Sequence, residues 1–160
     1  MTVVSAHKDV EAGTMTFVAE FDASVERVWE VWQDPRRLER WWGPPTWPAT
    51  FERHDFVVGG QSRYSMTGPA GEKARGWWTV TAIEAPHRLA FDDGCAGDDG
   101  EPLDTMRASH TVVTIEATGT GARMTAVSMF DSAEQLEQVV ERGAEEGMRL
   151  AMGQIDEVLA

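Results

Sequence analysis

The chain contains a single tyrosine, Tyr64, whose side chain could act on a bound molecule. A phenol against an apolar wall usually finds a hydrogen-bond partner, so Tyr64 could orient a ligand carbonyl or hydroxyl, or serve as a core tyrosine with its own partner. For acid–base chemistry, Glu52 or His54 together with Tyr64 is the best pair available. Arg63 could bind a carboxylate, but its alternation with Tyr64 predicts that it faces outward. We therefore assign no catalytic residue.

Metal and nucleophile chemistry lack their usual sequence signals. The four histidines are scattered, without the H-x-H or H-E-x-x-H spacing of metal sites. The one cysteine, Cys95, excludes an internal disulfide and a cysteine-based zinc site. Neighbouring carboxylates would raise the pKa of its thiol and make it a poor nucleophile. Neither a G-x-S-x-G elbow nor a phosphate-binding glycine loop occurs, so we expect no metal and no cofactor.

The composition of the chain limits the classes of partner that it could bind. The 160 residues carry a formal net charge of −13, which argues against nucleic acid and against an anionic membrane surface. No apolar run reaches the ~20 residues of a membrane span, and the first nine residues lack the apolar core of a signal peptide. A cytoplasmic protein that binds neither nucleic acid nor membrane is expected. The acidic, glycine-rich segment 92–104 lacks EF-hand spacing and is predicted to be a solvated lid.

Hydrophobic periodicity predicts the elements that must position these side chains. A half-buried strand covers 14–21, and Asp22-Ala23-Ser24 then starts an amphipathic helix. Asp34-Pro35 starts a second short helix that ends at Gly43-Pro44-Pro45. Further strands are predicted at 49–57, 61–67, 73–83, 88–92, 107–117 and 122–130, all able to pair antiparallel. One domain spans 1–160, with its core at 14–160 and residues 1–13 as an N-terminal extension.

The last segment predicts one long helix. Ser132-Ala-Glu-Gln135 matches a capping box, and no proline follows before Ala160. At ~1.5 Å per residue this helix would be about 40 Å long, with an apolar face that must lie on the sheet. Gly143 and Gly147 lie on that face. These small residues could allow close contact between helix and sheet, or could leave room for a ligand.

Several short motifs match a known family. They are Phe21-Asp22-Ala23 with Val28-Trp29, Asp34-Pro35 with Trp41-Trp42-Gly43-Pro44, Gly59-Gly60, Gly68-Pro69 with Gly71, Gly76-Trp77-Trp78, Arg88-Leu89, and Gly147-Met148 to Ile155. With them the chain resembles the START-like, Bet v-like helix-grip superfamily (SRPBCC), in the single-domain bacterial branch named after the activator of heat-shock-protein ATPase. The resemblance implies an α+β fold in which about seven curved antiparallel strands grip the C-terminal helix around a hydrophobic cavity, with two short helices after the first strand.

Strand alternation and the resemblance together give candidates for the cavity wall. They are Trp41, Trp42, Ser62, Tyr64, Met66, Trp78, Phe91, Val113, Met124, Gly143 and Gly147. Trp41 and Trp42 are adjacent on a helix and point about 100° apart, so one is expected in the core and the other nearer the mouth. At Ser62, relatives usually carry a bulky apolar residue, which predicts a wider or more polar cavity here.

Three functions remain open, because members of the superfamily bind lipids, sterols, polyketides or hormones, and some are cyclases or co-chaperone domains. The first is binding of a small hydrophobic molecule of lipid, polyketide or aromatic type without catalysis. The second is a polyketide cyclase or dehydratase, which needs an acid–base pair facing one pocket. The third is a co-chaperone-like interaction domain. A homodimer is also possible.

Overall fold

The computed structural model describes residues 3–103 and 108–160, which form one curved antiparallel sheet and five helices. The strands are β1 Val3–Asp9, β2 Thr14–Phe21, β3 Ala49–His54, β4 Gln61–Thr67, β5 Lys73–Glu84, β6 Arg88–Ala96, β7 Ser109–Ala117 and β8 Ala122–Met129. The helices are α1 Val25–Gln33, α2 Pro35–Leu38, α3 Ala133–Glu141, α4 Ala144–Gly153 and α5 Ile155–Leu159.

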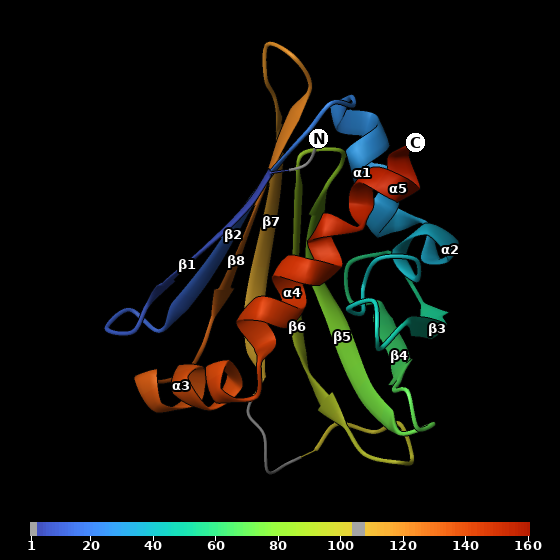
Figure 1. Ribbon diagram of the computed structural model, residues 1–160, viewed down its shortest axis with the longest axis vertical. Helices are drawn as coiled ribbons and strands as arrows, with labels where there is room; N and C mark the ends of the chain where they lie inside the picture. Colours follow the sequence, from blue (N-terminus) through green and yellow to red (C-terminus); the bar gives the residue numbers. More distant parts are fainter. Residues whose placement is uncertain (1–2, 104–107) are drawn as a thin grey trace.

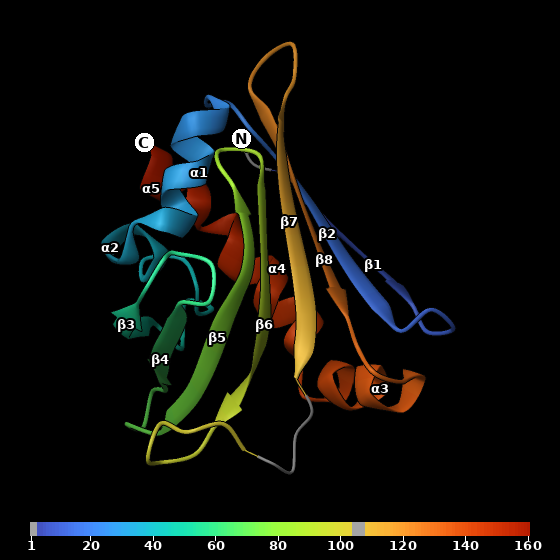
Figure 2. The same cartoon turned by 180° about the vertical axis from the view of Figure 1, so that it is seen from behind.

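The strand order is β1-β2-β8-β7-β6-β5-β4-β3, so the sheet is open between β1 and β3. The C-terminal helices lie on one face of this sheet, with α4 in front of it in Figure 1 and behind it in Figure 2. The inward side of each strand carries the buried alternate residues, such as Met15, Phe17 and Ala19 on β2. The expected α+β fold, with a curved sheet around a C-terminal helix, is confirmed.

The sheet has eight strands where about seven were expected. Residues 3–9, predicted to be an extension, pair along their whole length with β2, from Val3 opposite Glu20 to Asp9 opposite Thr14. Among residues 4–9 of this strand, Val4 and Ala6 alone are half-buried against the core, while His7, Lys8 and Asp9 are exposed. An edge strand with so few inward apolar residues gives a weak alternating signal.

The strand β6 is also longer than predicted. It was expected to end at Asp92, with an acidic loop beyond, but it continues to Ala96 and places Asp93 and Cys95 within the sheet. Asp98 and Asp99 lie in the exposed turn that follows, whereas Asp104 lies outside the described residues. Gly94 permits this extension because the Trp77 ring packs over it, only 2.9 Å from where a Cβ would stand.

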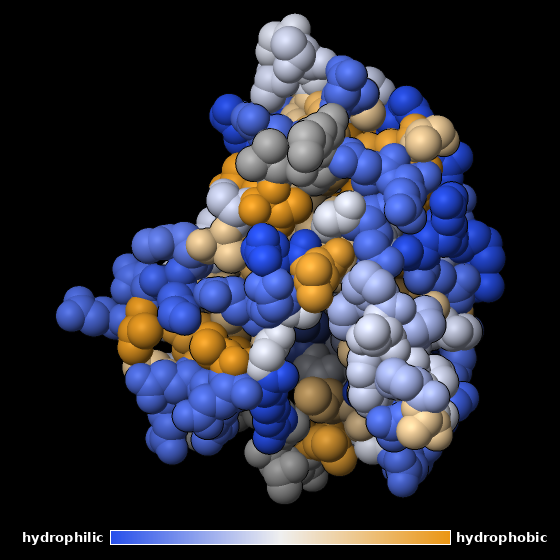
Figure 3. Space-filling model, viewed as in Figure 1, coloured by the Kyte–Doolittle hydropathy of each residue, from blue (hydrophilic) through white to orange (hydrophobic). Residues whose placement is uncertain are grey.

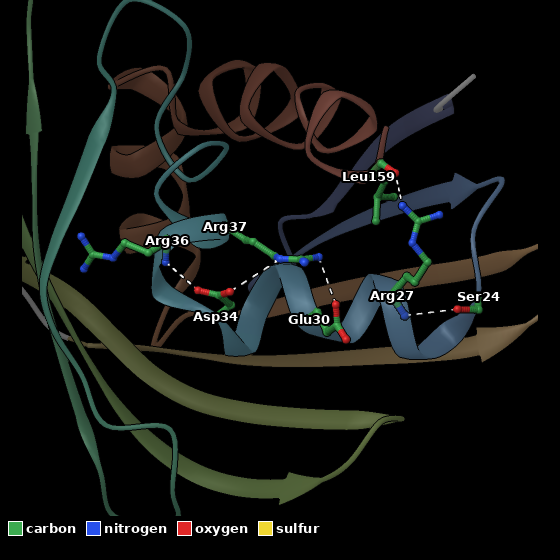
Figure 4. A network of polar contacts seen from close by, with 7 residues as sticks. All are labelled: Ser24, Arg27, Glu30, Asp34, Arg36, Arg37 and Leu159. Atoms are coloured by element: carbon green, nitrogen blue, oxygen red, sulfur yellow. Dashed lines mark hydrogen bonds and ion pairs between the residues drawn. The ribbon is translucent and has the colours of Figure 1, made fainter.

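The helices that follow β2 begin where predicted, but the second is shorter than expected, because α2 ends at Leu38 and not at Gly43. The Ser24 hydroxyl caps α1 by accepting a hydrogen bond from the Arg27 amide at 3.3 Å, and the Asp34 carboxylate caps α2 through the Arg36 amide at 2.9 Å. The Arg37 guanidinium then bridges Asp34 and Glu30 (Figure 4). These caps fix the positions from which Trp29 and Trp32 of α1, and Trp41 and Trp42 in the segment after α2, reach the core.

The end of the chain is anchored to α1. The Arg27 guanidinium donates a hydrogen bond to the Leu159 carbonyl of α5 (Figure 4), and Arg40 reaches the Glu157 carbonyl at 3.4 Å. Cationic side chains complement the unpaired carbonyls at a helix C-terminus. The last turn is thereby held beside the first helix of the fold.

The single C-terminal helix predicted from Ser132 onward is wrong, because the segment divides into α3, α4 and α5. Its start is correct, since the Ser132 hydroxyl accepts from the Gln135 amide at 3.1 Å. Gly143, however, adopts φ +82°, a left-handed conformation that ends α3 and turns the chain. As Figure 1 shows, α3 therefore lies at an angle to α4, at the lower end of the sheet.

Candidate functional site

A cavity of about 680 Å³ lies between the inner face of the sheet and the helices α3 and α4. This volume falls within the ~300–1,000 Å³ typical of small-molecule sites. Glu134, Gln138 and Val139 of α3 close one end of it. Figure 3 has the viewpoint of Figure 1, and its surface is hollowed between the positions of α4 and β5. The cavity meets solvent at this hollow.

Most of the wall is apolar. Met15 and Phe17 of β2, Phe91 of β6 and Ala126 of β8 line the sheet side. The remaining apolar contributors come from the helices, the segment after α2 and the neighbouring strands and turns, and they are Trp32, Trp42, Met66, Ala74, Phe130, Val139, Ala144, Met148 and Met152. Such a wall would favour a ligand with a large apolar body, since burial of apolar surface drives association.

The tryptophan Trp42 connects this wall to the aromatic core. Its ring lies edge-on to Trp78 at 4.8 Å between centroids and edge-on to Tyr64 at 5.7 Å. Trp78 in turn stacks on Phe91 at 4.2 Å. The indole of Trp41, by contrast, donates to the Val31 carbonyl at 2.9 Å inside the core.

A row of polar side chains crosses the inner face of three adjacent strands at one end of the cavity. We call Asp93 of β6, Ser109 and Thr111 of β7 and Ser128 of β8 the polar row; all four line the cavity. Strand register brings them together, because Asp93 pairs with Ser109, and Thr111 pairs with Ser128. The Ser109 hydroxyl donates to Asp93 Oδ1 at 2.8 Å, the Thr111 hydroxyl reaches the same oxygen at 3.4 Å, and Thr111 and Ser128 share a hydrogen bond of 2.9 Å.

Burial perturbs the acidity of the groups at this end. It raises the pKa of Asp93 to about 6, against the opposing effect of the hydrogen bonds from Ser109 and Thr111. It also raises the pKa of the Cys95 thiol, which lies one inward position further along β6. Asp93 therefore changes its protonation near neutral pH while the thiol stays protonated.

Tyr64 lies flat against the sheet at the edge of the cavity. Its ring stacks on Phe51 at 5.0 Å and covers Gly76 on the neighbouring strand, where an added Cβ would stand 2.3 Å from the phenol oxygen. Burial is the main reason why the pKa of Tyr64 is raised, and the nearby Asp93 raises it further. The phenol is consequently a neutral donor and acceptor within the same cavity.

Four of the predicted wall residues line the cavity, namely Trp42, Tyr64, Met66 and Phe91. Seven do not. Five of these are buried in the core beside it, namely Trp41, Ser62, Trp78, Val113 and Met124. The strand residues among them have the correct parity, and Trp41 follows α2, but all of them contact other core groups. Met124, for example, accepts the Trp32 indole N–H at 3.1 Å.

The two glycines among the predicted wall residues also lie away from the cavity. Gly143 is exposed at the junction of α3 and α4, and Gly147 is half-buried on α4 without contributing to the wall. The prediction for both glycines assumed one continuous helix, and the turn at Gly143 changes which face of α4 meets the sheet.

The acid–base pair suggested by the sequence is not assembled. Glu52 is directed outward and forms an ion pair with Arg75 at 3.3 Å. His54 uses both ring nitrogens inside the core, with Ser62 Oγ at 2.7 Å from Nδ1 and the Trp32 carbonyl at 2.9 Å from Nε2. A carbonyl can only accept, so Nε2 carries the proton and Nδ1 accepts from Ser62, and burial lowers the pKa of the imidazole.

The polar row was missed as a site, although part of its signal was available. Ser109 and Thr111 share parity with the inward Val113, and Ser128 shares parity with Met124. Asp93 was hidden because its glycine-rich surroundings favoured a loop. Across residues 3–103 and 108–160, no group of three metal-ligating side chains is found, and no helix among them is long and apolar enough to cross a membrane.

Comparison with known protein families assigns the chain to one of them. The family described as activator of Hsp90 ATPase homolog 1-like protein matches residues 22–160. The chain belongs to this family. The resemblance inferred from the sequence motifs is thereby confirmed.

Solved structures agree with this assignment. A protein from Arthrobacter aurescens, solved by NMR, is 58% identical over 97% of this chain and 90% of its own, with a TM-score of 0.93. Protein Ms6760 from Mycobacterium smegmatis, solved by crystallography, is 43% identical over 99% of this chain and 98% of its own, with a TM-score of 0.91. A Rhodobacter sphaeroides protein at 22% identity, covering 98% of both chains with a TM-score of 0.84, shares the fold. No curated protein matches the chain.

Proposed function

We propose that the protein binds a small, largely apolar molecule in the cavity between the sheet and the helices α3 and α4. The observation that carries the proposal is the cavity itself, about 680 Å³ with a mostly apolar wall that the polar row interrupts at one end. Few polar groups on an apolar wall are the usual composition of small-molecule sites, in which burial supplies affinity and the polar groups fix orientation.

The first experiment is native mass spectrometry of the purified protein, which would show a bound molecule as an added mass. Titration with 1-decanol and with 1-ethylnaphthalene by calorimetry then supplies two defined apolar probes. For 1-decanol, tryptophan fluorescence gives a second signal, because the Trp32 and Trp42 rings line the cavity. Saturable binding of either probe is expected.

A matched pair of variants locates the binding. Ala126 lines the cavity, whereas Val127 is the next residue of β8 and faces the other side of the sheet. Ala126→Phe should fill part of the cavity and weaken binding, and Val127→Phe should leave it unchanged; Ala126→Leu is the milder variant if the larger ring prevents folding. The proposal fails if neither probe binds, or if filling the cavity has no effect on affinity.

The cysteine Cys95 offers an independent measure of occupancy. It is the chain's single cysteine, and it is exposed to solvent where it lines the cavity. A bound probe should slow its alkylation by a maleimide in the wild type. Unchanged alkylation at saturating probe would place the probe elsewhere.

A further inference from the structure

The cavity has a polar end and an apolar end, and this division restricts what can fill it. The polar row lies on β6, β7 and β8, next to the turn that leads into α3. Two residues further along β6 and β8, the side chains of Phe91 and Ala126 are apolar, and so is that of Met152 on α4. A molecule that is apolar throughout would cover the polar row without replacing its hydrogen bonds to water, which is costly.

The carboxylate of Asp93 has one oxygen free for such a molecule. Ser109 and Thr111 both donate to Oδ1, and within the described residues no hydrogen bond or ion pair reaches Oδ2. Asp93 lines the cavity, and each carboxylate oxygen can accept two hydrogen bonds. The hydroxyl network therefore holds the carboxylate in place and leaves an acceptor for a donor that arrives from the cavity.

The charged and titratable groups around Asp93 do not supply this donor in the described residues. On its own strand, Cys95 lies two residues on, and Asp92 faces the opposite side of the sheet, where its carboxylate pairs with His110 of β7 at 2.6 Å. From β4 comes the Tyr64 phenol.

The cations that line the same cavity are Arg75 of β5 and Arg142, which directly follows α3. Arg75 is engaged by Glu52 on the outer side. No ion pair joins either guanidinium to Asp93 within the described residues, while Glu134 of α3 adds a second carboxylate to the wall. The guanidiniums and carboxylates on this wall are equal in number, so it is the open acceptor on Asp93, and not the net charge, that favours a donor.

We infer, resting on the proposed function above, that the ligand is amphipathic: a hydroxyl or amine head group donates a hydrogen bond to Asp93 Oδ2 while its apolar body lies along Phe91 and Met152. A head group that is itself a carboxylate is disfavoured. Asparagine at this position could accept the same hydrogen bonds from Ser109 and Thr111, so holding the strands together does not require a carboxylate. A perturbed titratable group in a cavity is typical of functional positions.

The test uses one apolar body with different head groups. The probes are 2-(1-naphthyl)ethylamine, 2-(1-naphthyl)ethanol, 1-naphthylacetic acid and 1-ethylnaphthalene, measured by calorimetry at pH 8; decylamine, 1-decanol and decanoic acid repeat the comparison on a flexible chain. At this pH Asp93 is ionised, while Tyr64 and Cys95 stay protonated. In the wild type, the amine and the alcohol should bind about tenfold or more tightly than the acid, because a hydrogen bond to a charged group is strong.

Asp93→Asn and its neighbour Asp92→Asn are the matched variants. Asp93→Asn should lower affinity for the amine about tenfold and raise it for the acid, because the new amide donates where Oδ2 accepted. The alcohol, which can also accept, should lose less. Affinity for 1-ethylnaphthalene should stay the same, and Asp92→Asn should change no affinity.

The outcomes separate the two proposals. If 1-ethylnaphthalene or 1-decanol binds and Asp93→Asn leaves the order of head groups unchanged, the inference about Asp93 is overturned and the apolar site stands. Tighter binding of the acid than of the amine to the wild type would overturn it as well. If no probe of either series binds, the proposed function fails, and the head-group inference fails with it.

Discussion

Replacing Asp93 by asparagine should stabilise the folded protein at neutral pH. The pKa of this carboxyl rises from 3.8 to about 6 on folding, chiefly through burial. At ~1.4 kcal/mol for each tenfold change in acidity, folding disfavours the ionised carboxyl relative to the neutral one by about 3 kcal/mol, compared with the unfolded state. The asparagine amide is neutral at every pH and can still accept from Ser109 and Thr111, so it should regain most of this free energy.

The direction of the pKa shift determines the pH range in which the two proteins differ in stability. In the folded protein Asp93 binds its proton more tightly than in the unfolded chain. The contribution of the protonated carboxyl to folding stability is therefore fully present below pH ~4 and is lost as pH rises through 6. The two proteins should therefore have equal free energies of unfolding near pH 4. Asp93→Asn should be more stable by up to about 3 kcal/mol at pH 8.

The assay is urea unfolding followed by tryptophan fluorescence at intervals between pH 4 and pH 8, with the slope m checked for constancy. The difference between the two proteins is the quantity of interest, because His54 adds a slope of its own: its lowered pKa destabilises both proteins as pH falls. Asp92→Asn is the control, since it changes a contact with His110 at 2.6 Å in which both side chains are about two-fifths exposed. Such pairs contribute ~0–1 kcal/mol.

The reasoning is refuted if Asp93→Asn is no more stable than the wild type at pH 8, or if their difference does not vary with pH. Either result would mean that the hydrogen bonds from Ser109 and Thr111 outweigh the desolvation of the carboxylate. The ionised Asp93 carboxylate would then stabilise the folded protein. A loss of folding stability caused by Asp93 could no longer be used to support a role of this residue in binding.

Three further predictions concern backbone and core. Gly143→Ala should destabilise by ~1–2 kcal/mol because of the left-handed φ, whereas Gly147→Ala, inside α4 with open space beside it, should stabilise by up to about 1 kcal/mol; opposite shifts in thermal midpoint would verify both. Gly76→Ala should cost ~1–3 kcal/mol by displacing the Tyr64 ring, and a cost that persists undiminished in a Tyr64→Ala background would contradict that cause. In NMR titration, the His54 ring should protonate below pH 6.5, and a midpoint above that value would argue against its burial.

The sequence predicted most of the fold because its strongest signals are local. Ser24 and Asp34 cap the helices at the residues where capping chemistry placed them, and strand parity put Tyr64 and Phe91 on the cavity side. The break at Gly143 was missed because glycine is compatible with a helix as well as with its end. The choice between these depends on how α3 packs over the end of the cavity, which lies outside any local pattern.

The site was harder to predict than the fold. Trp41 and Trp42 differ by one position, yet only Trp42 reaches the cavity, and their spacing alone could not say which. The extension of β6 to Asp93 depends on Gly94 being covered by Trp77 from the next strand. Such contacts between distant residues decide whether a polar side chain faces solvent or a ligand.

The two ends of α4 are held very differently. Close to its C-terminus, the Gln154 side-chain amide donates to the Gly43 carbonyl at 2.7 Å, which ties the helix to the loop that follows the paired tryptophans. At its N-terminus, Gly143 is exposed and an added Cβ there would meet no atom within 4 Å. In the first turn, Glu145 pairs with Lys8 of β1 at 3.8 Å, and both side chains are about one-third to two-fifths exposed. Such pairs contribute ~0–1 kcal/mol, so the end of α4 near the tryptophans is the more firmly held of the two.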